Sequence, residues 1–246
     1  MSLLCIAHRG ASAEAPENTL RAFARALALG ADGIELDVQV TRDGVPVVFH
    51  DTTLMHLTGA RGRLVDRTWP ELRKLRVQGE PIPTLADVLS LTRQPAIVQI
   101  EIKKNTPVAP VLAAIRKTAS TAHVILASFE HEILREAAAL APKLPRMLIA
   151  DKPKIPGPFY TKSAKNAKIE SFAMKLLHTL DSVGAGGISV CHEAIKSPLL
   201  VETIHRHGAK LWCWTVNDVR TLRRLRDYAV DAILTDDPAK LIKTLR

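Results

Sequence analysis

The sequence predicts an α/β fold, a closed (β/α)8 TIM barrel with a small insertion after the second strand. First, short apolar runs rich in Val, Ile and Leu alternate with helical stretches along all 246 residues, as parallel βαβ units do. Second, such barrels often occupy roughly 200–250 residues as one domain. Third, the first turn, His8-Arg9-Gly10-Ala11-Ser12, lacks the G-x-G-x-x-G pattern of the alternative, a doubly wound open sheet. We therefore expect one domain over residues 1–246.

The elements follow in order from local pattern. Strands are expected where the apolar runs fall, at 3–7, 33–40, 97–103, 123–127, 146–149, 186–190, 210–214 and 231–234. Helices are expected between them, at 18–29, 84–92, 107–119, 130–140, about 165–182, 198–207, 218–227 and 238–245. Helix-start signals are Asn18 or Thr19, Ser197-Pro198, and Asn217 or Asp218. Glycines stand where helices should end, at Gly30, Gly184 and Gly208.

The segment 51–83 is too long for a plain connection. It carries Gly, Arg and Pro with weak periodicity, so we expect an insertion above the carboxyl rim of the barrel, where such loops build sites. Trp69-Pro70-Glu71-Leu72 is expected to start a short helix within it.

Composition excludes several classes of protein. With 47% hydrophobic and 24% charged residues the chain is neither disordered nor fibrous. No apolar run reaches the roughly 18 residues of a membrane span, so no transmembrane segment is expected. The N-terminal run lacks the basic start of a signal peptide and is predicted to form the first strand. Cys5, Cys191 and Cys213 lie in or beside apolar segments without metal-ligand spacing, which favours reduced thiols in a cytoplasmic protein.

The net charge of +9 allows a nucleic acid, an anionic membrane surface or a small anionic substrate as partner. Aromatic residues make up only 4% of the chain and no nucleic-acid motif is present, so we expect no nucleic-acid partner. One run of lysines forms either a solvated face or a loop near an anionic ligand. Its members are Lys152, Lys154, Lys162, Lys165, Lys168 and Lys175.

Acidic side chains of two predicted strands point to a metal. The strand 33–40 alternates strictly, so its apolar residues face the helices while Glu35, Asp37 and Gln39 face the barrel interior. The next strand of the barrel brings Glu101 inward in the same way. Two neighbouring strands can therefore bring Glu35, Asp37 and Glu101 together at one rim, where buried carboxylates are costly unless paired or metal-bound.

Two interpretations of this acid cluster remain open. Three oxygen donors suit a hard divalent cation, Mg²⁺ or Ca²⁺. Alternatively, Arg9 or Lys103 neutralises the acids in a buried salt-bridge network. Formal charge favours the metal: the three acids, a divalent ion, Arg9 and Lys103 together carry +1, which a small anionic substrate with one charge neutralises. Without the ion they carry −1 and would repel such a substrate.

Two histidines are expected at the same rim. His8 follows the strand 3–7, and His50 follows the apolar run 45–49, so both stand at carboxyl ends of strands, where barrels keep their sites. Together with the carboxylates they are candidates for a general acid and a general base. Arg9 is suited to binding a phosphate or carboxylate, and Glu17 is a further candidate to face the site. The remaining seven histidines have no such context and are expected at the surface or at caps.

Several motifs occur in a recognisable order. They are His8-Arg9-Gly10, Pro16-Glu17-Asn18-Thr19, Glu35-x-Asp37, Asp43-Gly44-x-Pro46-Val47-x-x-His50-Asp51, Ile82-Pro83-Thr84-Leu85, Glu101-x-Lys103, Trp214-Thr215-Val216-Asn217 and Leu234-Thr235-Asp236-Asp237-Pro238. In this order the sequence resembles the glycerophosphodiester phosphodiesterase family from about residue 4 to 240, loosely over 142–197.

The resemblance implies a metal-dependent phosphodiesterase barrel that hydrolyses small-molecule glycerophosphodiesters to glycerol 3-phosphate and an alcohol. It implies metal ligands at Glu35, Asp37 and Glu101, an acid–base pair at His8 and His50, phosphate contacts from Arg9 and Lys103, and a pocket wall at Trp214. The stretch 54–60 departs from the family: its usual arginine is absent and His56 stands one residue past the usual aspartate. That departure bears on head-group selectivity.

Other functions remain as alternatives. One is a phospholipase D-like enzyme that acts on lysolipids at a membrane surface, and another is a phosphate-ligand binding protein without catalysis. The sequence does not choose between Mg²⁺ and Ca²⁺, between water and a substrate hydroxyl as nucleophile, or between the two histidines as acid. It also leaves the alcohol and the oligomeric state open.

Overall fold

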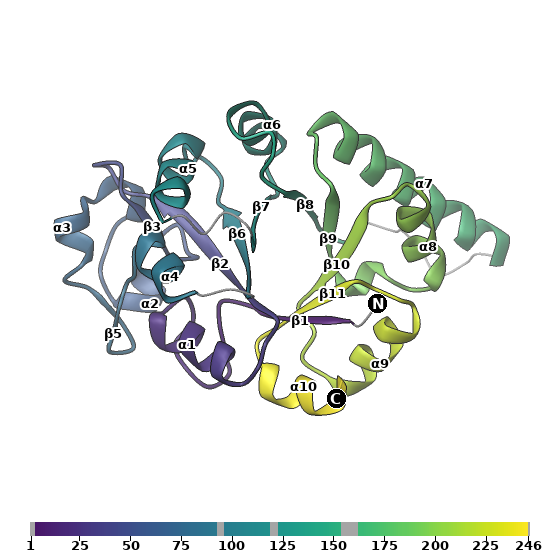
Figure 1. Cartoon of the computed structure of the whole chain (residues 1–246), viewed down its shortest axis with the longest axis horizontal. Helices are drawn as coiled ribbons and strands as arrows, with labels where there is room; N and C mark the ends of the chain where they lie inside the picture. Colours follow the sequence, from purple (N-terminus) through teal and green to yellow (C-terminus); the bar gives the residue numbers. More distant parts are fainter. Residues whose placement is uncertain (1–2, 93–95, 119–122, 154–161, 246) are drawn as a thin grey trace.

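Eight parallel strands close into a barrel in the computed structural model, which describes residues 3–92, 96–118, 123–153 and 162–245 (Figure 1). The strands are β1 (Leu4–Ala7), β2 (Gly33–Val40), β6 (Ile97–Ile102), β7 (Val124–Ser128), β8 (Arg146–Ala150), β9 (Gly187–Cys191), β10 (Lys210–Trp214) and β11 (Ala232–Thr235). β1 pairs with β11 on one side and with β2 on the other, which closes the ring. The predicted TIM barrel is therefore confirmed, with every strand within one residue of its expected bounds.

Helices surround the strands on the outside (Figure 1). They are α1 (Leu20–Ala28), α4 (Leu85–Leu91), α5 (Val108–Lys117), α6 (His131–Leu140), α7 (Lys162–Ser182), α8 (Pro198–Arg206), α9 (Val219–Asp227) and α10 (Pro238–Leu245). Capping residues set several ends, as expected: Thr19 accepts from the Ala22 N–H ahead of α1, and Asp218 accepts from the Thr221 N–H ahead of α9.

The strict alternation of β2 sorts its side chains between two environments. Ile34 and Leu36 pack outward in a buried cluster with Phe23 of α1 and Leu85 of α4. The opposite face of the barrel strands points inward. Apart from the acidic side, the interior is filled by apolar residues, namely Ile6, Ala127, Met147, Ile149, Trp212, Ala232 and Leu234. The inward polar side chains of β2, Glu35, Asp37 and Gln39, therefore face an apolar side of the barrel interior. In such surroundings polar groups interact strongly with one another, which favours a defined site.

The run before His50 forms β3 (Pro46–Val48), and its direction differs from the expectation. β3 lies antiparallel to β2, so the prediction of a strand running toward the carboxyl rim is wrong. β2 continues to Val40, two residues beyond its last pairing with β6 at Val38, and a tight turn with Gly44 at φ +84° reverses the chain. β3 then descends, so that His50 still arrives at the barrel mouth.

The insertion at 51–83 has a small core of its own. It contains α2 (Met55–Thr58), a 3₁₀ turn η1 (Leu64–Asp66), α3 (Trp69–Leu72), β4 (Arg76–Val77) and β5 (Glu80–Pro81). Buried residues from β3 and the insertion pack together, namely Val47, Phe49, Leu54, Leu64, Leu72, Val77 and Ile82. The helix expected at Trp69 is present, with a capping box between Thr68 and Glu71.

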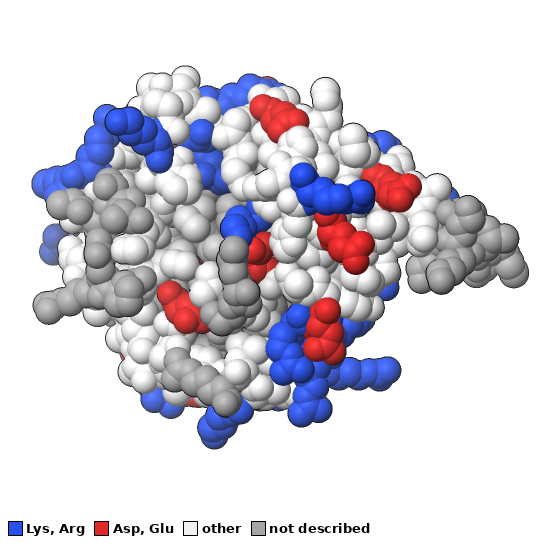
Figure 2. All heavy atoms as spheres, turned by 45° about the vertical axis from the view of Figure 1, so that its right-hand side comes forward, with Lys and Arg blue, Asp and Glu red and all other residues white. Residues whose placement is uncertain are grey.

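Positive and negative side chains are mixed on the surface of the molecule. Figure 2 shows Lys and Arg side chains interspersed with Asp and Glu on one face. In the lysine run, Lys152 pairs with Glu193, Lys175 is exposed, and Lys154 lies outside the described residues. Among the described helices, none is both long and apolar enough to cross a bilayer. Cys191 and Cys213 are free thiols, and burial raises the pKa of the Cys213 thiol.

Candidate active site

Three carboxylates meet at the carboxyl end of the barrel, as the alternation of the strands predicted. Glu35 and Asp37 lie on β2 and Glu101 on the adjacent β6, where Asp37 and Glu101 are direct cross-strand partners. Glu35 and Asp37 are almost fully buried. Each of the three residues offers an oxygen within 4.8 Å of the others. Oxygens bound to one ion are separated by at most twice the metal–oxygen distance, about 4–5 Å for Mg²⁺ or Ca²⁺, so the cluster has the dimensions of a shared cation site.

The three acids do not ionise alike. Burial, reinforced by the charge of Asp37, raises the pKa of Glu35 to about 8. Burial and Asp37 also raise the pKa of Glu101. Burial acts in the same direction on Asp37, but the adjacent Lys103 and Arg9 outweigh it and lower the pKa of Asp37. Without a further cation, the cluster therefore holds at least one proton near neutral pH.

The expected salt-bridge partners are in place but cover only part of the cluster. Lys103 Nζ donates to Glu101 Oε1 at 2.6 Å and to Asp37 Oδ1 at 3.2 Å. Arg9 Nε lies 3.2 Å from Asp37 Oδ2 and its Nη1 donates to Glu17 Oε1 at 3.0 Å. Glu35 has no Lys or Arg side chain within ion-pair distance among the described residues. A divalent ion would supply the missing charge, so the donor set fits a metal better than a network alone.

The Nδ1 atom of His8 is hydrogen-bonded to a carboxylate, that of Asp236. Its Nδ1 is 2.8 Å from Asp236 Oδ1, while its Nε2 is 4.0 Å from Glu35 Oε2. Asp236 is itself held, since Ser12 Oγ donates to its Oδ1 at 3.2 Å and Asn217 Nδ2 donates to its Oδ2 at 2.7 Å. Burial would lower the pKa of His8, but Asp236 and Glu35 outweigh it and raise that pKa. Asp236 belongs to a sequence motif near the end of the chain, but its role beside His8 was not predicted.

His50 has a similar arrangement with a different partner. Its Nδ1 is 2.8 Å from Asp51 Oδ1, and Asp51 Oδ2 is 3.0 Å from Nδ1 of the exposed His56. His56 is exposed, as expected, and α2 of the insertion also carries it next to Asp51. Gln39 fixes this turn: its Nε2 donates to the carbonyl oxygens of Phe49 and Asp51, each at 2.9 Å.

A buried asparagine completes the support of the acid cluster. Asn18 was expected as a possible helix cap, but Thr19 caps α1. The Asn18 side chain instead turns inward, where Nδ2 donates to Asp37 Oδ2 at 2.8 Å and Oδ1 accepts from the Asp37 N–H at 3.2 Å. Its backbone φ of +57°, a conformation that asparagine adopts more readily than most residues, makes this orientation possible.

One cavity of about 190 Å³ joins these groups. His8, His50, Arg9 and Lys103 lie on its charged side, together with Glu35 and Glu101. Trp214 lines the opposite side, as expected, along with Phe129, Ile149 and Leu234. Two imidazoles, an acid cluster and two cations around one small cavity can bind an anionic phosphate group and exchange protons with it.

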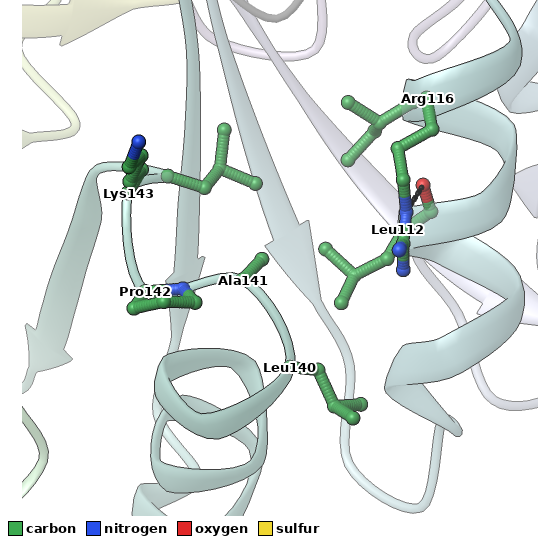
Figure 3. Close-up of a pocket in the computed structure, with 8 residues that line it drawn as sticks. Leu112, Arg116, Leu140, Ala141, Pro142 and Lys143 are labelled. Carbon is green, nitrogen blue, oxygen red and sulfur yellow. Dashed lines mark hydrogen bonds between the residues drawn. The ribbon is translucent and has the colours of Figure 1, made fainter.

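A second cavity, of about 400 Å³, is larger than the one at the barrel mouth but lacks acidic and histidine side chains. It lies between α5 and the loop after α6 and is lined mainly by Leu112, Leu140 and Pro142, with Arg116 and Lys143 at its edge (Figure 3). Neither a carboxylate nor a histidine lines it. We therefore place the candidate site at the barrel mouth.

Known proteins resemble this chain along nearly its whole length. Residues 8–240 match the model of the glycerophosphoryl diester phosphodiesterase family. A glycerophosphodiester phosphodiesterase of Caldanaerobacter subterraneus subsp. tengcongensis is 37% identical, over 100% of this chain and 99% of the relative. Among solved structures, an Oleispira antarctica phosphodiesterase in complex with the product sn-glycerol-3-phosphate superposes with a TM-score of 0.84 at 25% identity, covering 99% and 96% of the two chains. A Thermotoga maritima glycerophosphodiester phosphodiesterase gives a TM-score of 0.79 at 28% identity over 99% of each chain.

Proposed function

The chain belongs to the glycerophosphoryl diester phosphodiesterase family, and from that premise we propose that it hydrolyses glycerophosphodiesters to glycerol 3-phosphate and an alcohol. The product named for the Oleispira antarctica relative supports this reaction. The observation that carries the proposal is the pair of carboxylate-held imidazoles, His8 and His50, that line one cavity with the acid cluster. The free thiols of Cys191 and Cys213 support a cytoplasmic location as part of the same proposal.

We propose a divalent cation, Mg²⁺ or Ca²⁺, at Glu35, Asp37 and Glu101. The support is the all-oxygen donor set within 4.8 Å and the absence of a Lys or Arg partner for Glu35 among the described residues. When bound, such an ion supplies positive charge to the phosphoryl oxygens, which neutralises the diester and stabilises charge that develops as the bond breaks. Three carboxylates without a nitrogen or sulfur ligand suit either ion.

The histidines are proposed to move protons on opposite sides of the phosphorus atom. One Nε2 takes the proton of the nucleophile, either water or the neighbouring hydroxyl of the glycerol. The other donates a proton to the leaving alkoxide. Asp236 and Asp51 accept hydrogen bonds from the two Nδ1 atoms, which leaves each Nε2 available to the cavity and stabilises the imidazolium form. Arg9 and Lys103 are proposed to bind phosphoryl oxygens.

Two further residues are proposed to shape substrate binding. Glu17 holds the Arg9 guanidinium from the side away from Asp37, so it orients the phosphate-binding cation. Trp214 forms part of the apolar wall and is proposed to contact the organic part of the substrate.

The test is product analysis with glycerophosphocholine in the presence of Mg²⁺ or Ca²⁺. We expect glycerol 3-phosphate and choline, detected by ³¹P NMR and by a choline assay. Choline phosphate and glycerol as products would show that the other phosphorus–oxygen bond is cleaved, and would overturn the proposed bond specificity. No turnover with either ion across several glycerophosphodiesters would overturn the proposed reaction.

A further inference from the structure

The barrel mouth is divided into a charged half and an apolar half. The proposed catalytic and metal-binding side chains come from β1, β2, β6 and the turn after β3. The other half is lined by residues of β7 to β11 and contains Phe129, Ile149, Trp214 and Leu234. Because phosphate chemistry needs only the charged half, the apolar half is free to select the organic part of the substrate.

An aromatic contact closes the apolar half. Phe129 directly follows β7 and Trp214 ends β10, with β8 and β9 between them in the sheet. Even so, their rings meet edge to face with centroids 5.9 Å apart, the favourable geometry for an aromatic pair. The indole Nε1 of Trp214 donates to the Ser189 carbonyl of β9 at 3.2 Å. The two rings therefore bridge over the ends of β8 and β9, above Ile149 and Ser189.

The cavity that this bridge helps to line is small, and it must hold both the phosphate group and the organic part of the substrate. The cavity of about 190 Å³ is only slightly larger than an engineered cavity of about 150 Å³ that binds benzene, and smaller than the roughly 300–1,000 Å³ of sites for larger ligands. A glyceryl group has as many non-hydrogen atoms as benzene, so its size suits the part of this cavity next to the phosphate group. A glyceryl group that carries a long acyl chain exceeds the volume of the cavity.

A polar group at the cavity lining favours a free glyceryl group over an acylated one. Gln99 of β6 is 1% exposed and lines the cavity. Its Oε1 has no hydrogen-bond partner among the described residues, and its Nε2 meets only the weak acceptor Met147 Sδ at 3.6 Å. A buried amide oxygen without a hydrogen-bond partner is unfavourable. A free hydroxyl of the substrate would satisfy it, whereas an esterified oxygen has no proton to donate.

From these contacts we propose that the Phe129–Trp214 bridge sizes the cavity for an unesterified glyceryl group and excludes lysolipids, which makes Phe129 a specificity-determining residue. The inference rests on the proposed phosphodiesterase function and adds to it a residue that sets the size of the substrate. Phe129 is 41% exposed and stands at the outer edge of the bridge, so its truncation opens the cavity toward solvent without removing a buried core residue.

The first experiment compares kcat/KM for glycerophosphocholine and for a 1-acyl lysophosphatidylcholine below its micelle concentration, both measured by choline release. We expect the parent chain to prefer glycerophosphocholine by at least about 100-fold, and Phe129→Ala to narrow the preference by at least about tenfold. Met174→Ala is the control, since Met174 is an exposed apolar side chain of α7 away from the site, and it should leave the preference unchanged. Equal use of both substrates by the parent chain, or an unchanged preference in Phe129→Ala, would overturn the inference.

A binding experiment separates this inference from the proposed reaction. Calorimetry with Mg²⁺ present compares glycerol 3-phosphate with 1-hexanoyl-glycerol 3-phosphate, and needs no turnover. We expect the parent chain to bind the first ligand at least about tenfold more tightly and Phe129→Ala to bind the two alike. Equal binding by the parent chain would refute the size selection. An inactive parent chain that still discriminates between these ligands would refute only the reaction.

Discussion

Binding of Mg²⁺ is expected to release about one proton per ion from the acid cluster at pH 7. Glu35 carries the proton, because burial and Asp37 raise the pKa of its carboxyl to about 8. At pH 7 a group with that pKa is about 90% protonated, and at pH 9 about 10%. A carboxyl must ionise to bind the ion, so the release should be about 0.9 proton at pH 7 and about 0.1 at pH 9. The raised pKa of Glu101 can only add to this release.

Isothermal titration calorimetry in two buffers of different ionisation enthalpy measures the protons released. The apparent binding enthalpy changes between buffers in proportion to that number, so each pH needs one pair of titrations. Glu35→Gln replaces the titrating carboxyl by an amide and should abolish most of the release at pH 7. Glu170→Gln is a matched control, because Glu170 is an exposed glutamate of α7, and should leave the release unchanged. Binding without proton release at pH 7, or equal release at pH 7 and pH 9, would refute the assigned protonation of Glu35.

Three other outcomes follow from the site. Chelation by EDTA should abolish hydrolysis of glycerophosphocholine, and added Mg²⁺ or Ca²⁺ should restore it. Hydrolysis that persists in EDTA would favour a salt-bridge network of the acids with Arg9 and Lys103 over a bound metal. His8→Ala and His50→Ala should each lower kcat by at least about 100-fold, while circular dichroism shows that the fold is retained. Asp236→Asn should lower kcat about 10- to 100-fold, because it removes a charge-assisted hydrogen bond to His8. Any of these variants with the kcat of the parent chain would remove that residue from the mechanism. In the metal-free chain, the raised pKa of Glu35 means that folding stability is lost as pH rises from about 4.5 to about 8. Glu35→Gln should therefore gain stability relative to the parent chain across that window in urea unfolding, and a constant difference would contradict the shift.

Local pattern predicted the barrel well because its signals are local. The two-residue alternation of 33–40 shows which side chains share a face, and the helix caps at Thr19 and Asp218 are satisfied by neighbours three residues away. The acid cluster could be anticipated for the same reason: consecutive barrel strands are neighbours, so the inward positions of β2 and β6 must meet. Strand direction carries no such signal, and for that reason the antiparallel course of β3 was not predicted.

Contacts between distant parts of the chain required the closed ring. His8 and Asp236 are 228 positions apart and meet because β1 pairs with β11, with Ala7 opposite Thr235. Phe129 follows β7 and Trp214 ends β10, two strands that do not pair, so the contact between their rings depends on the closed barrel.

The sequence by itself determined the type and order of the elements and the chemical types of group available for a phosphodiester, because hydrophobic period and residue identity are properties of the chain. The tertiary structure decided which groups support which. Closure of the barrel assigned Asp236 to His8, and the descending β3 placed His50 beside Asp51. Burial acts to raise the pKa of both Glu35 and Asp37, but Lys103 and Arg9 next to Asp37 leave the proton on Glu35. The physical reason is that pairing and desolvation depend on distances across the barrel, which no stretch of sequence encodes alone.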